Sequence, residues 1–194
     1  VLAVFMISAV QAQFQFDISA GAAIPSGPGT KAGVNFSLEP KYGLPFGMVT
    51  GFRVEAALTA RGFASSDGTT ASANVAGLMS YMATSDYYPL HYLRLGFQPF
   101  VGGGAGLYDM AAASFAESGS GMSSASGSAA VQKFGGMARA GFEIRHFRFA
   151  IEYNFIGSTV YAYTDSQGNV GTVTSRNSYM GIKFGVLIGG GHRR

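Results

Sequence analysis

The chain contains no cysteine and no tryptophan, and only 12% of its 194 residues are charged. The absence of cysteine excludes disulfide bonds. The charged fraction is about half of the quarter that is usual in soluble proteins, and chains that expose an apolar face to lipid have this bias. The net charge of +3 is small and the basic residues are scattered along the chain, so the sequence gives no argument for nucleic-acid binding.

Long hydrophobic runs are also missing. The sequence opens with ten largely apolar residues, VLAVFMISAV, but a membrane-spanning helix needs roughly 20. This run ends at Val10-Gln11-Ala12, with small residues at the two positions that a signal peptidase reads. We therefore expect residues 1–12 to be a signal peptide without its charged start; a first buried strand is the alternative. Later apolar runs are soon interrupted, so any membrane crossing would use strands.

What the chain has instead is strict alternation of apolar and polar residues. Residues 134–155, FGGMARAGFEIRHFRFAIEYNF, contain two alternating segments on either side of Arg145-His146, which predicts a β-hairpin with a two-residue turn. One face of this hairpin is apolar and the other carries charges. The expected cross-strand pairs are Ile144 with Phe147, Glu143 with Arg148, and Arg139 with Glu152.

Similar alternation predicts six more strands, at about 14–20, 34–41, 52–61, 75–95, 99–108 and 180–188, and no helix. The connections alternate between long and short, as a barrel with short turns at one rim and long loops at the other requires. We therefore expect an all-β fold, an eight-stranded antiparallel up-and-down transmembrane β-barrel over residues 13–188, with a flexible basic tail at 189–194. Residues 111–130 and 157–177 are its long polar loops. Three glycines, Gly102, Gly104 and Gly106, are expected to face inward and make room for long side chains.

The charged residues of the predicted strands all fall on the face opposite the apolar one. They are Asp17, Glu39, Lys41, Arg53, Glu55, Arg61, Arg94, Arg139, Glu143, Arg148, Glu152 and Lys183. An eight-stranded barrel is just wide enough for side chains to fill its interior, so we expect a charge-paired core and no water-filled channel. The expected interior ion pairs involve Arg139, Glu152, Glu143, Arg148, Arg53, Glu55, Arg94 and Lys183. A gated pore or proton path is the alternative. Tyrosines at 42, 87, 88, 92 and 153 are candidates for interfacial aromatic belts.

Four stretches resemble the small bacterial outer-membrane β-barrel family of OmpA/OmpX type. They are the signal-like end Gln11-Ala12-Gln13, FQPFVGGGAGLY at 97–108, GFEIRHFRFAIEYNF at 141–155, and SYMGIKFGVLIGGG at 178–191. The resemblance implies the outer membrane of a Gram-negative bacterium as location, with membrane lipid as a partner. In this family the last strand often ends the protein on an aromatic residue, whereas Ile188 is followed here by GGGHRR.

Catalysis has little support in the sequence. A serine hydrolase needs a histidine near its nucleophile, and none of His91, His146 and His192 lies near the predicted long loops. Clustered metal ligands are missing too, so we expect no enzyme, metal or cofactor. The favoured hypothesis is a structural or interaction barrel with no open channel, which binds a protein or surface ligand at loops 111–130 and 157–177. A porin-like barrel for small solutes is the alternative, and a soluble lipocalin-like carrier is a more distant one.

Overall fold

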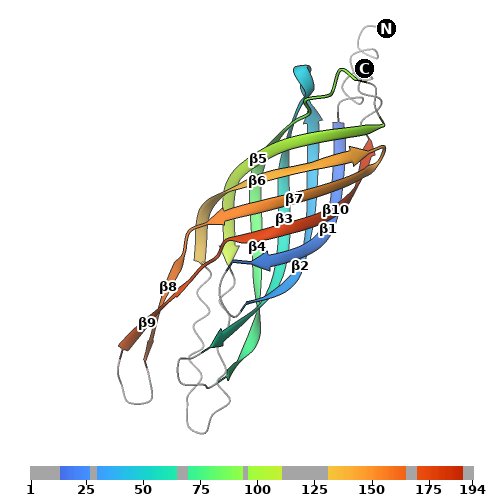
Figure 1. The fold of residues 1–194 in the computed structure, drawn as a ribbon. Helices are drawn as coiled ribbons and strands as arrows, with labels where there is room; N and C mark the ends of the chain where they lie inside the picture. Colours follow the sequence, from blue (N-terminus) through green and yellow to red (C-terminus); the bar gives the residue numbers. More distant parts are fainter. Residues whose placement is uncertain are drawn as a thin grey trace.

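The computed structural model describes residues 14–26, 30–64, 70–93, 96–110, 131–164 and 170–189. Eight of its strands close into an antiparallel barrel, in the order β1-β10-β7-β6-β5-β4-β3-β2 (Figure 1). These strands are β1 (Phe14–Pro25), β2 (Thr30–Gly43), β3 (Met48–Ala64), β4 (Thr70–Tyr87), β5 (Phe97–Met110), β6 (Val131–Ile144), β7 (Phe147–Ile156) and β10 (Tyr179–Gly189). The expected eight-stranded antiparallel barrel is therefore confirmed.

The two ends of the barrel differ in their connections. One end, which we call the turn rim, carries the 3-10 turn η1 (Pro45–Gly47), the described connection residues 88–93, and the turn Arg145-His146. The other end, the loop rim, carries the connections from β1 to β2, β3 to β4, β5 to β6 and β7 to β10. Between β7 and β10 the chain forms a separate two-stranded sheet, β8 (Thr159–Thr164) and β9 (Val170–Ser175), which extends away from the barrel (Figure 1).

The central hairpin has the expected register. Glu143 pairs with Arg148 and Arg139 with Glu152 along the β6 and β7 backbones. The two-residue turn forms although Arg145 has a φ of 55°, a left-handed conformation that glycine adopts more readily. A hydrogen bond of 2.7 Å from the Leu187 N–H to the His146 carbonyl ties this turn to the end of β10.

The fourth strand ends earlier than the sequence indicates. β4 stops at Tyr87, and the expected strand residue Leu93 lies in a connection of successive turns. Hydrogen bonds run there from the His91 N–H to the Tyr88 carbonyl, at 3.2 Å, and from the Leu93 N–H to the Leu90 carbonyl, at 3.0 Å. Pro89 has no N–H with which to continue a β ladder. The alternation of apolar and polar residues after it therefore belongs to a turn region and not to a strand. β5 accordingly starts at Phe97, before the predicted Pro99.

The segment 157–177, predicted to be a polar loop, contains the β8–β9 hairpin, so that prediction is wrong in part. Its register runs from Thr159 opposite Ser175 to Thr164 opposite Val170. Both strand sequences, TVYAYT and VGTVTS, are rich in the β-branched and aromatic residues that favour extended backbone. The second predicted loop, 111–130, lies outside the described residues, as do the predicted signal peptide and residues 190–194 of the tail.

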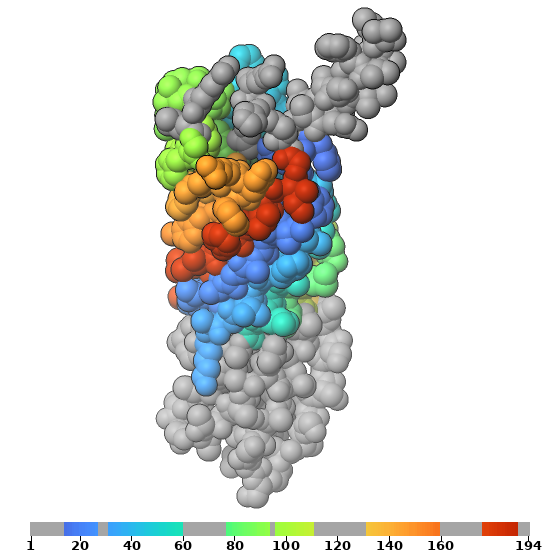
Figure 2. Space-filling view, turned by 90° about the vertical axis from the view of Figure 1, so that its right-hand side faces the viewer, coloured from blue at the N-terminus to red at the C-terminus, as the bar shows by residue number. Residues whose placement is uncertain are grey.

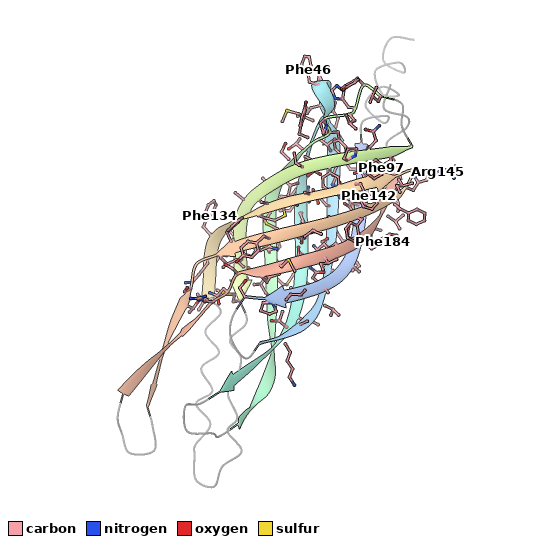
Figure 3. The ribbon with its side chains drawn as sticks, viewed as in Figure 1. Phe46, Phe97, Phe134, Phe142, Arg145 and Phe184 are labelled. Atoms are coloured by element: carbon pink, nitrogen blue, oxygen red, sulfur yellow. The ribbon has the colours of Figure 1, made fainter. Side chains whose placement is uncertain are left out.

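The barrel wall is apolar outside and polar inside. Its exposed aromatic residues include Phe36, Phe52, Phe97, Phe134, Phe155 and Phe184, and Figure 3 labels several of them on the wall. Figure 2 shows β10, β1 and β2 as successive red, blue and light-blue oblique bands, because the strands are tilted. This arrangement contradicts the lipocalin-like alternative, in which the apolar face lines the interior. Of the five belt tyrosines, Tyr88 is fully buried, while Tyr42, Tyr87, Tyr92 and Tyr153 are exposed.

Among the described residues, no helix has the length and the hydropathy of a membrane span.

Candidate functional site in the barrel interior

Among the residues that the structure describes, six carboxylates and five cationic side chains are buried in the barrel interior. They are Asp17, Glu39, Glu55, Asp86, Glu143 and Glu152, with Lys41, Arg53, Arg139, Arg148 and Lys183. The strand pleat places them there, because alternate residues of each strand point inward. Ion pairs divide them into two groups, one nearer the turn rim and one nearer the loop rim.

The first group, the turn-side cluster, consists of Asp17, Glu39, Lys41, Asp86, Arg139, Glu143 and Arg148. Asp86 is at its centre. Its carboxylate lies 2.7 Å from Arg139 Nε, 2.8 Å from an Arg148 terminal nitrogen and 3.2 Å from Lys41 Nζ. Arg139 also binds Glu39 at 2.7 Å. With four carboxylates and three cations, this cluster has a formal charge of −1 if all members are ionised.

The second group, the loop-side cluster, consists of Arg53, Glu55, Glu152 and Lys183. Arg53 donates two hydrogen bonds to the Glu152 carboxylate, at 2.7 and 2.6 Å, and also pairs with Glu55. Lys183 Nζ lies 2.7 Å from Glu55 and 3.0 Å from Glu152. Both carboxylates thus contact both cations, and this cluster is formally neutral.

Of the two side-chain ion pairs expected across the central hairpin, one forms and the other does not. Arg148 and Glu143 do contact each other, at 2.7 Å. Arg139 and Glu152 are backbone neighbours, but their side chains join different clusters: Arg139 reaches Asp86 and Glu39, whereas Glu152 binds Arg53 and Lys183. Arg94 lies outside the described residues.

Sequence reasoning missed Asp86, which has more cationic partners than any other described carboxylate. Its strand was assigned from Leu93 and Leu95, which follow the end of β4. If the faces of β4 are assigned from the residues before Tyr87, Asp86 falls on the inner face with Met82 and Thr84, because alternate residues of a strand share a face.

The glycine face of β5 explains how Arg139 reaches Asp86. Gly102 pairs with Asp86 on β4 and with Arg139 on β6, so it lies between them. Because Gly102 has no side chain, the Arg139 guanidinium can cross β5 and bind the carboxylate. The sequence-based expectation that inward glycines make room for long side chains agrees with this contact.

Replacing Gly102 with alanine is expected to destabilise the barrel by about 1–3 kcal/mol, the usual effect of overpacking. A Cβ at this position would run into the Asp86 carboxylate and lie 2.6 Å from the Ser85 carbonyl oxygen. Urea unfolding of the refolded protein measures the effect. Gly157→Ala is the control, because a Cβ there meets nothing within 4 Å. Equal losses in the two variants would contradict the steric role of Gly102.

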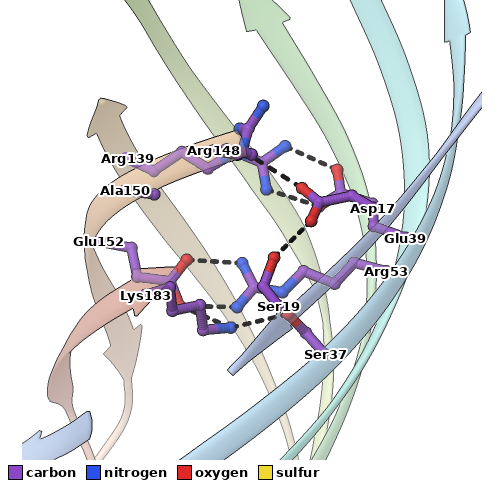
Figure 4. Close-up of a pocket in the computed structure, with 10 residues that line it drawn as sticks. All are labelled: Asp17, Ser19, Ser37, Glu39, Arg53, Arg139, Arg148, Ala150, Glu152 and Lys183. Carbon is purple, nitrogen blue, oxygen red and sulfur yellow. Dashed lines mark hydrogen bonds and ion pairs between the residues drawn. The ribbon is translucent and has the colours of Figure 1, made fainter. Parts of the chain in front are cut away.

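A small cavity separates the two clusters. It is lined by charged residues of both clusters together with Ser19, Ser37 and Ala150, and Figure 4 shows the clusters facing each other across it. The volume of this cavity, taken as the space that the centre of a water molecule can reach, is about 10 Å³. That is about the room that a single water molecule needs.

Apolar groups close the interior beyond each cluster. On the turn side Val49, Tyr88 and Phe100 form this cap, and Ala150, which belongs to the same apolar cluster, also lines the cavity. The Arg148 guanidinium carbon lies 3.7 Å from the centre of the Phe100 ring, and the Tyr88 hydroxyl donates a hydrogen bond to Glu143. Toward the loop rim lies a second apolar cluster, made of Ala23, Ala57, Leu78, Met82, Tyr108, Met110, Met137, Ile156 and Tyr179.

The described histidines lie at the turn rim, away from the long loops. His91 Nδ1 is 3.0 Å from the Tyr88 carbonyl oxygen, and His146 Nδ1 is 3.3 Å from the Leu187 carbonyl oxygen. In the part of the chain that the structure describes, no group of three or more His, Cys, Asp or Glu residues is arranged to hold a metal ion.

A closed eight-stranded barrel with an apolar exterior and an ion-paired interior defines the class of small outer-membrane β-barrels. Known structures of this class share the fold. Neisserial surface protein A (NspA) is 16% identical over 90% of this chain and 96% of its own, with a TM-score of 0.57. The outer membrane protein OprG from Pseudomonas aeruginosa is 15% identical over 91% of this chain and 96% of its own, with a TM-score of 0.56. At these identities the likeness concerns the fold alone. No family model and no curated protein matches the sequence.

Proposed function

We propose that this chain is an outer-membrane protein of a Gram-negative bacterium that acts as a structural or interaction barrel without an open channel. The observation that carries this proposal is the packing of both ion-pair clusters across the barrel. Every carboxylate of these clusters contacts a cation, and the cavity between them has room for about one water molecule. A solute larger than water would have to break several ion pairs to pass.

The loop rim is the proposed interaction end. Outer-membrane barrels carry short turns on the periplasmic side and longer loops outside the cell, which assigns the turn rim to the periplasm. Binding residues are often on loops held by a rigid scaffold. We therefore place a protein or surface ligand at residues 111–130 and 157–177, the second of which includes the β8–β9 hairpin. Outer-membrane lipid contacts the exposed aromatic wall.

Transport of small solutes is the second candidate. The polar cavity between the clusters favours it, because a modest rearrangement of the ion pairs would widen an already hydrophilic path. Gating of this kind requires that the charged residues of the clusters exchange ion-pair partners. A structural barrel requires that these ion pairs persist.

Conductance measurements in planar lipid bilayers test the proposal. The folded protein, identified by a band that shifts on boiling, is expected to give no conductance steps above those of the lipid alone. Neutralising Arg139 and Glu152 together, as Arg139→Gln with Glu152→Gln, removes one charge from each cluster and is expected to lower stability without creating a pore.

The matched control for this double variant is Lys133→Gln with Asp109→Asn. It also removes one positive and one negative charge, but from residues outside both clusters, which bind the Ser158 carbonyl and Gln132. Conductance steps in the folded wild-type protein that change in the interior variant and not in this control would establish the transport function instead.

A further inference from the structure

The charged residues outside the barrel interior are divided unevenly between the two rims. By sequence position each rim has four basic residues: Lys31, Arg61, Lys133 and Arg176 at the loop rim, and Arg94, Arg145, Arg193 and Arg194 at the turn rim. The acidic residues outside the interior are all at the loop rim: Asp67, Asp109, Glu117 and Asp165. Four positive and four negative charges therefore cancel at the loop rim, whereas the turn rim has a formal charge of +4.

Arg145 is the described arginine of the turn rim. It lies at the tip of the β6–β7 hairpin, where Figure 3 labels it, and its side chain is exposed. Its φ of 55° is a left-handed conformation that glycine and asparagine adopt more readily than arginine. Glu143, two residues before it, is buried in the barrel and binds Arg148. Neither the backbone of the turn nor the ion pair of Glu143 thus accounts for an arginine at this position.

Exposed apolar side chains surround this turn. Ile144 and Phe147 adjoin it on either side, and Phe97 lies opposite Ile144 on β5; all three are exposed on the outer wall. Arg145 therefore extends the lipid-facing wall at its edge. In a membrane this edge is the level at which hydrocarbon meets the headgroups, where a long basic side chain can keep its charge among the headgroups.

The type of basic residue indicates which anion the turn rim binds. All four basic residues there are arginines, whereas the loop rim has two lysines and two arginines. The planar guanidinium group can donate two parallel hydrogen bonds to one phosphate. Arg193 and Arg194 follow the last residue of β10 by four and five positions, so the covalent chain keeps them within about 18 Å of Gly189. The end of β10 is itself hydrogen-bonded to the Arg145 turn, from Leu187 to His146.

We propose that the turn rim is a binding surface for anionic phospholipid headgroups, with Arg145 at its centre. The Arg145 guanidinium donates to the headgroup phosphate, while Ile144 and Phe147 contact the acyl chains below it. Each basic residue close to an anionic membrane surface strengthens binding about fivefold. The loop rim lacks this attraction because its charges cancel. The surface is at the opposite end of the barrel from the loops that are proposed to bind a protein or surface ligand, and it does not depend on that partner.

Spin-labelled lipids measure this preference, because lipids held at the protein surface move more slowly than those of the bulk bilayer. In phosphatidylcholine vesicles we expect the folded protein to bind spin-labelled phosphatidylglycerol several-fold more strongly than spin-labelled phosphatidylcholine. The difference is expected to shrink in salt of about 1 M, which screens exposed charges. Equal binding of the two lipids would overturn the proposal.

Two triple variants that change the net charge equally locate the surface. The turn-rim variant combines Arg145→Asn, Arg193→Gln and Arg194→Gln, and the loop-rim control combines Lys31→Gln, Lys133→Gln and Arg176→Gln. We expect the turn-rim variant to lose the preference for phosphatidylglycerol and the control to keep it, with both folded by the band shift on boiling. An equal loss in the two variants contradicts the proposal.

Single variants of Arg145 separate lipid binding from a role in the turn. Asparagine suits the left-handed backbone better, so Arg145→Asn is expected to maintain or raise the urea midpoint while it lowers the phosphatidylglycerol preference about fivefold. Arg145→Lys keeps the charge and is expected to retain most of the preference. A lower midpoint in Arg145→Asn with an unchanged lipid preference would mean that Arg145 serves the turn alone, against the proposal.

Cosedimentation with purified peptidoglycan examines the competing anionic partner. We expect no binding that depends on the turn-rim arginines. If the wild-type protein binds peptidoglycan, the turn-rim variant does not, and neither shows a lipid preference, the basic rim is a peptidoglycan site and the proposal is wrong.

Discussion

Replacing Asp86 with asparagine is expected to lower the unfolding free energy by about 1.5–3 kcal/mol, the usual contribution of a buried hydrogen bond to a charged group. Each of its cations loses one carboxylate partner and keeps another, since Lys41 still binds Asp17, Arg139 still binds Glu39 and Arg148 still binds Glu143. Asp86 binds three cations, Arg139, Arg148 and Lys41, and all of them are buried. An amide of the same shape keeps the packing but removes the negative charge. Urea unfolding in lipid vesicles, followed by circular dichroism because the chain has no tryptophan, measures the loss.

Asp109→Asn is the matched control for this variant. Asp109 is the next described aspartate along the chain, and its recorded partner is the neutral Gln132 side chain, at 2.8 Å. Its replacement is expected to change stability by less than about 0.5 kcal/mol, as is usual for substitutions away from buried networks. Similar small changes in both variants would mean that the turn-side cluster contributes little to stability.

The second large effect is expected on the outer wall. Phe184 lies at the middle of β10, points outward and is 57% exposed. If this wall faces lipid, Phe184→Arg is expected to cost about 2–4 kcal/mol, the penalty for an arginine near the middle of the bilayer. The same unfolding assay in vesicles measures it.

Ile188→Arg provides the depth control for the outer wall. Ile188 is on the same strand and the same face, but it lies one residue from the end of β10 at the turn rim. There the expected cost is about 0–1 kcal/mol, because the arginine can reach the interface. Equal costs at the two positions would contradict a membrane that covers the middle of the strand.

The barrel was predictable because the strand pleat leaves a direct trace in the sequence. Side chains alternate between two faces, so the apolar and charged residues of 134–155 identify both the strands and their register. The long segments between strands were less readable. In 157–177 the polar residues obscured the β8–β9 hairpin, and after Tyr87 a turn happened to alternate like a strand.

The partners within the interior were not predictable. Register identifies which residues are opposite each other along two strands, but long side chains can choose among several strands once the barrel is closed. Arg139 bypasses its backbone neighbour Glu152 and crosses Gly102 to reach Asp86. Arg53 and Glu152 pair although 99 residues separate them, which only the closed barrel makes possible.

The pairing of β1 with β10 has a consequence for assembly. It joins the first and the last strand of the barrel, for example at Gln15 and Gly189. The barrel therefore closes only when both of these strands are present. Lys183, on the closing strand, is also the partner of Glu55 on β3. Until the barrel closes, Glu55 and Lys183 cannot form their ion pair, and exposing these charged side chains to the hydrocarbon of the bilayer would cost free energy. Insertion into the bilayer and closure of the ring are therefore expected to occur as one concerted event.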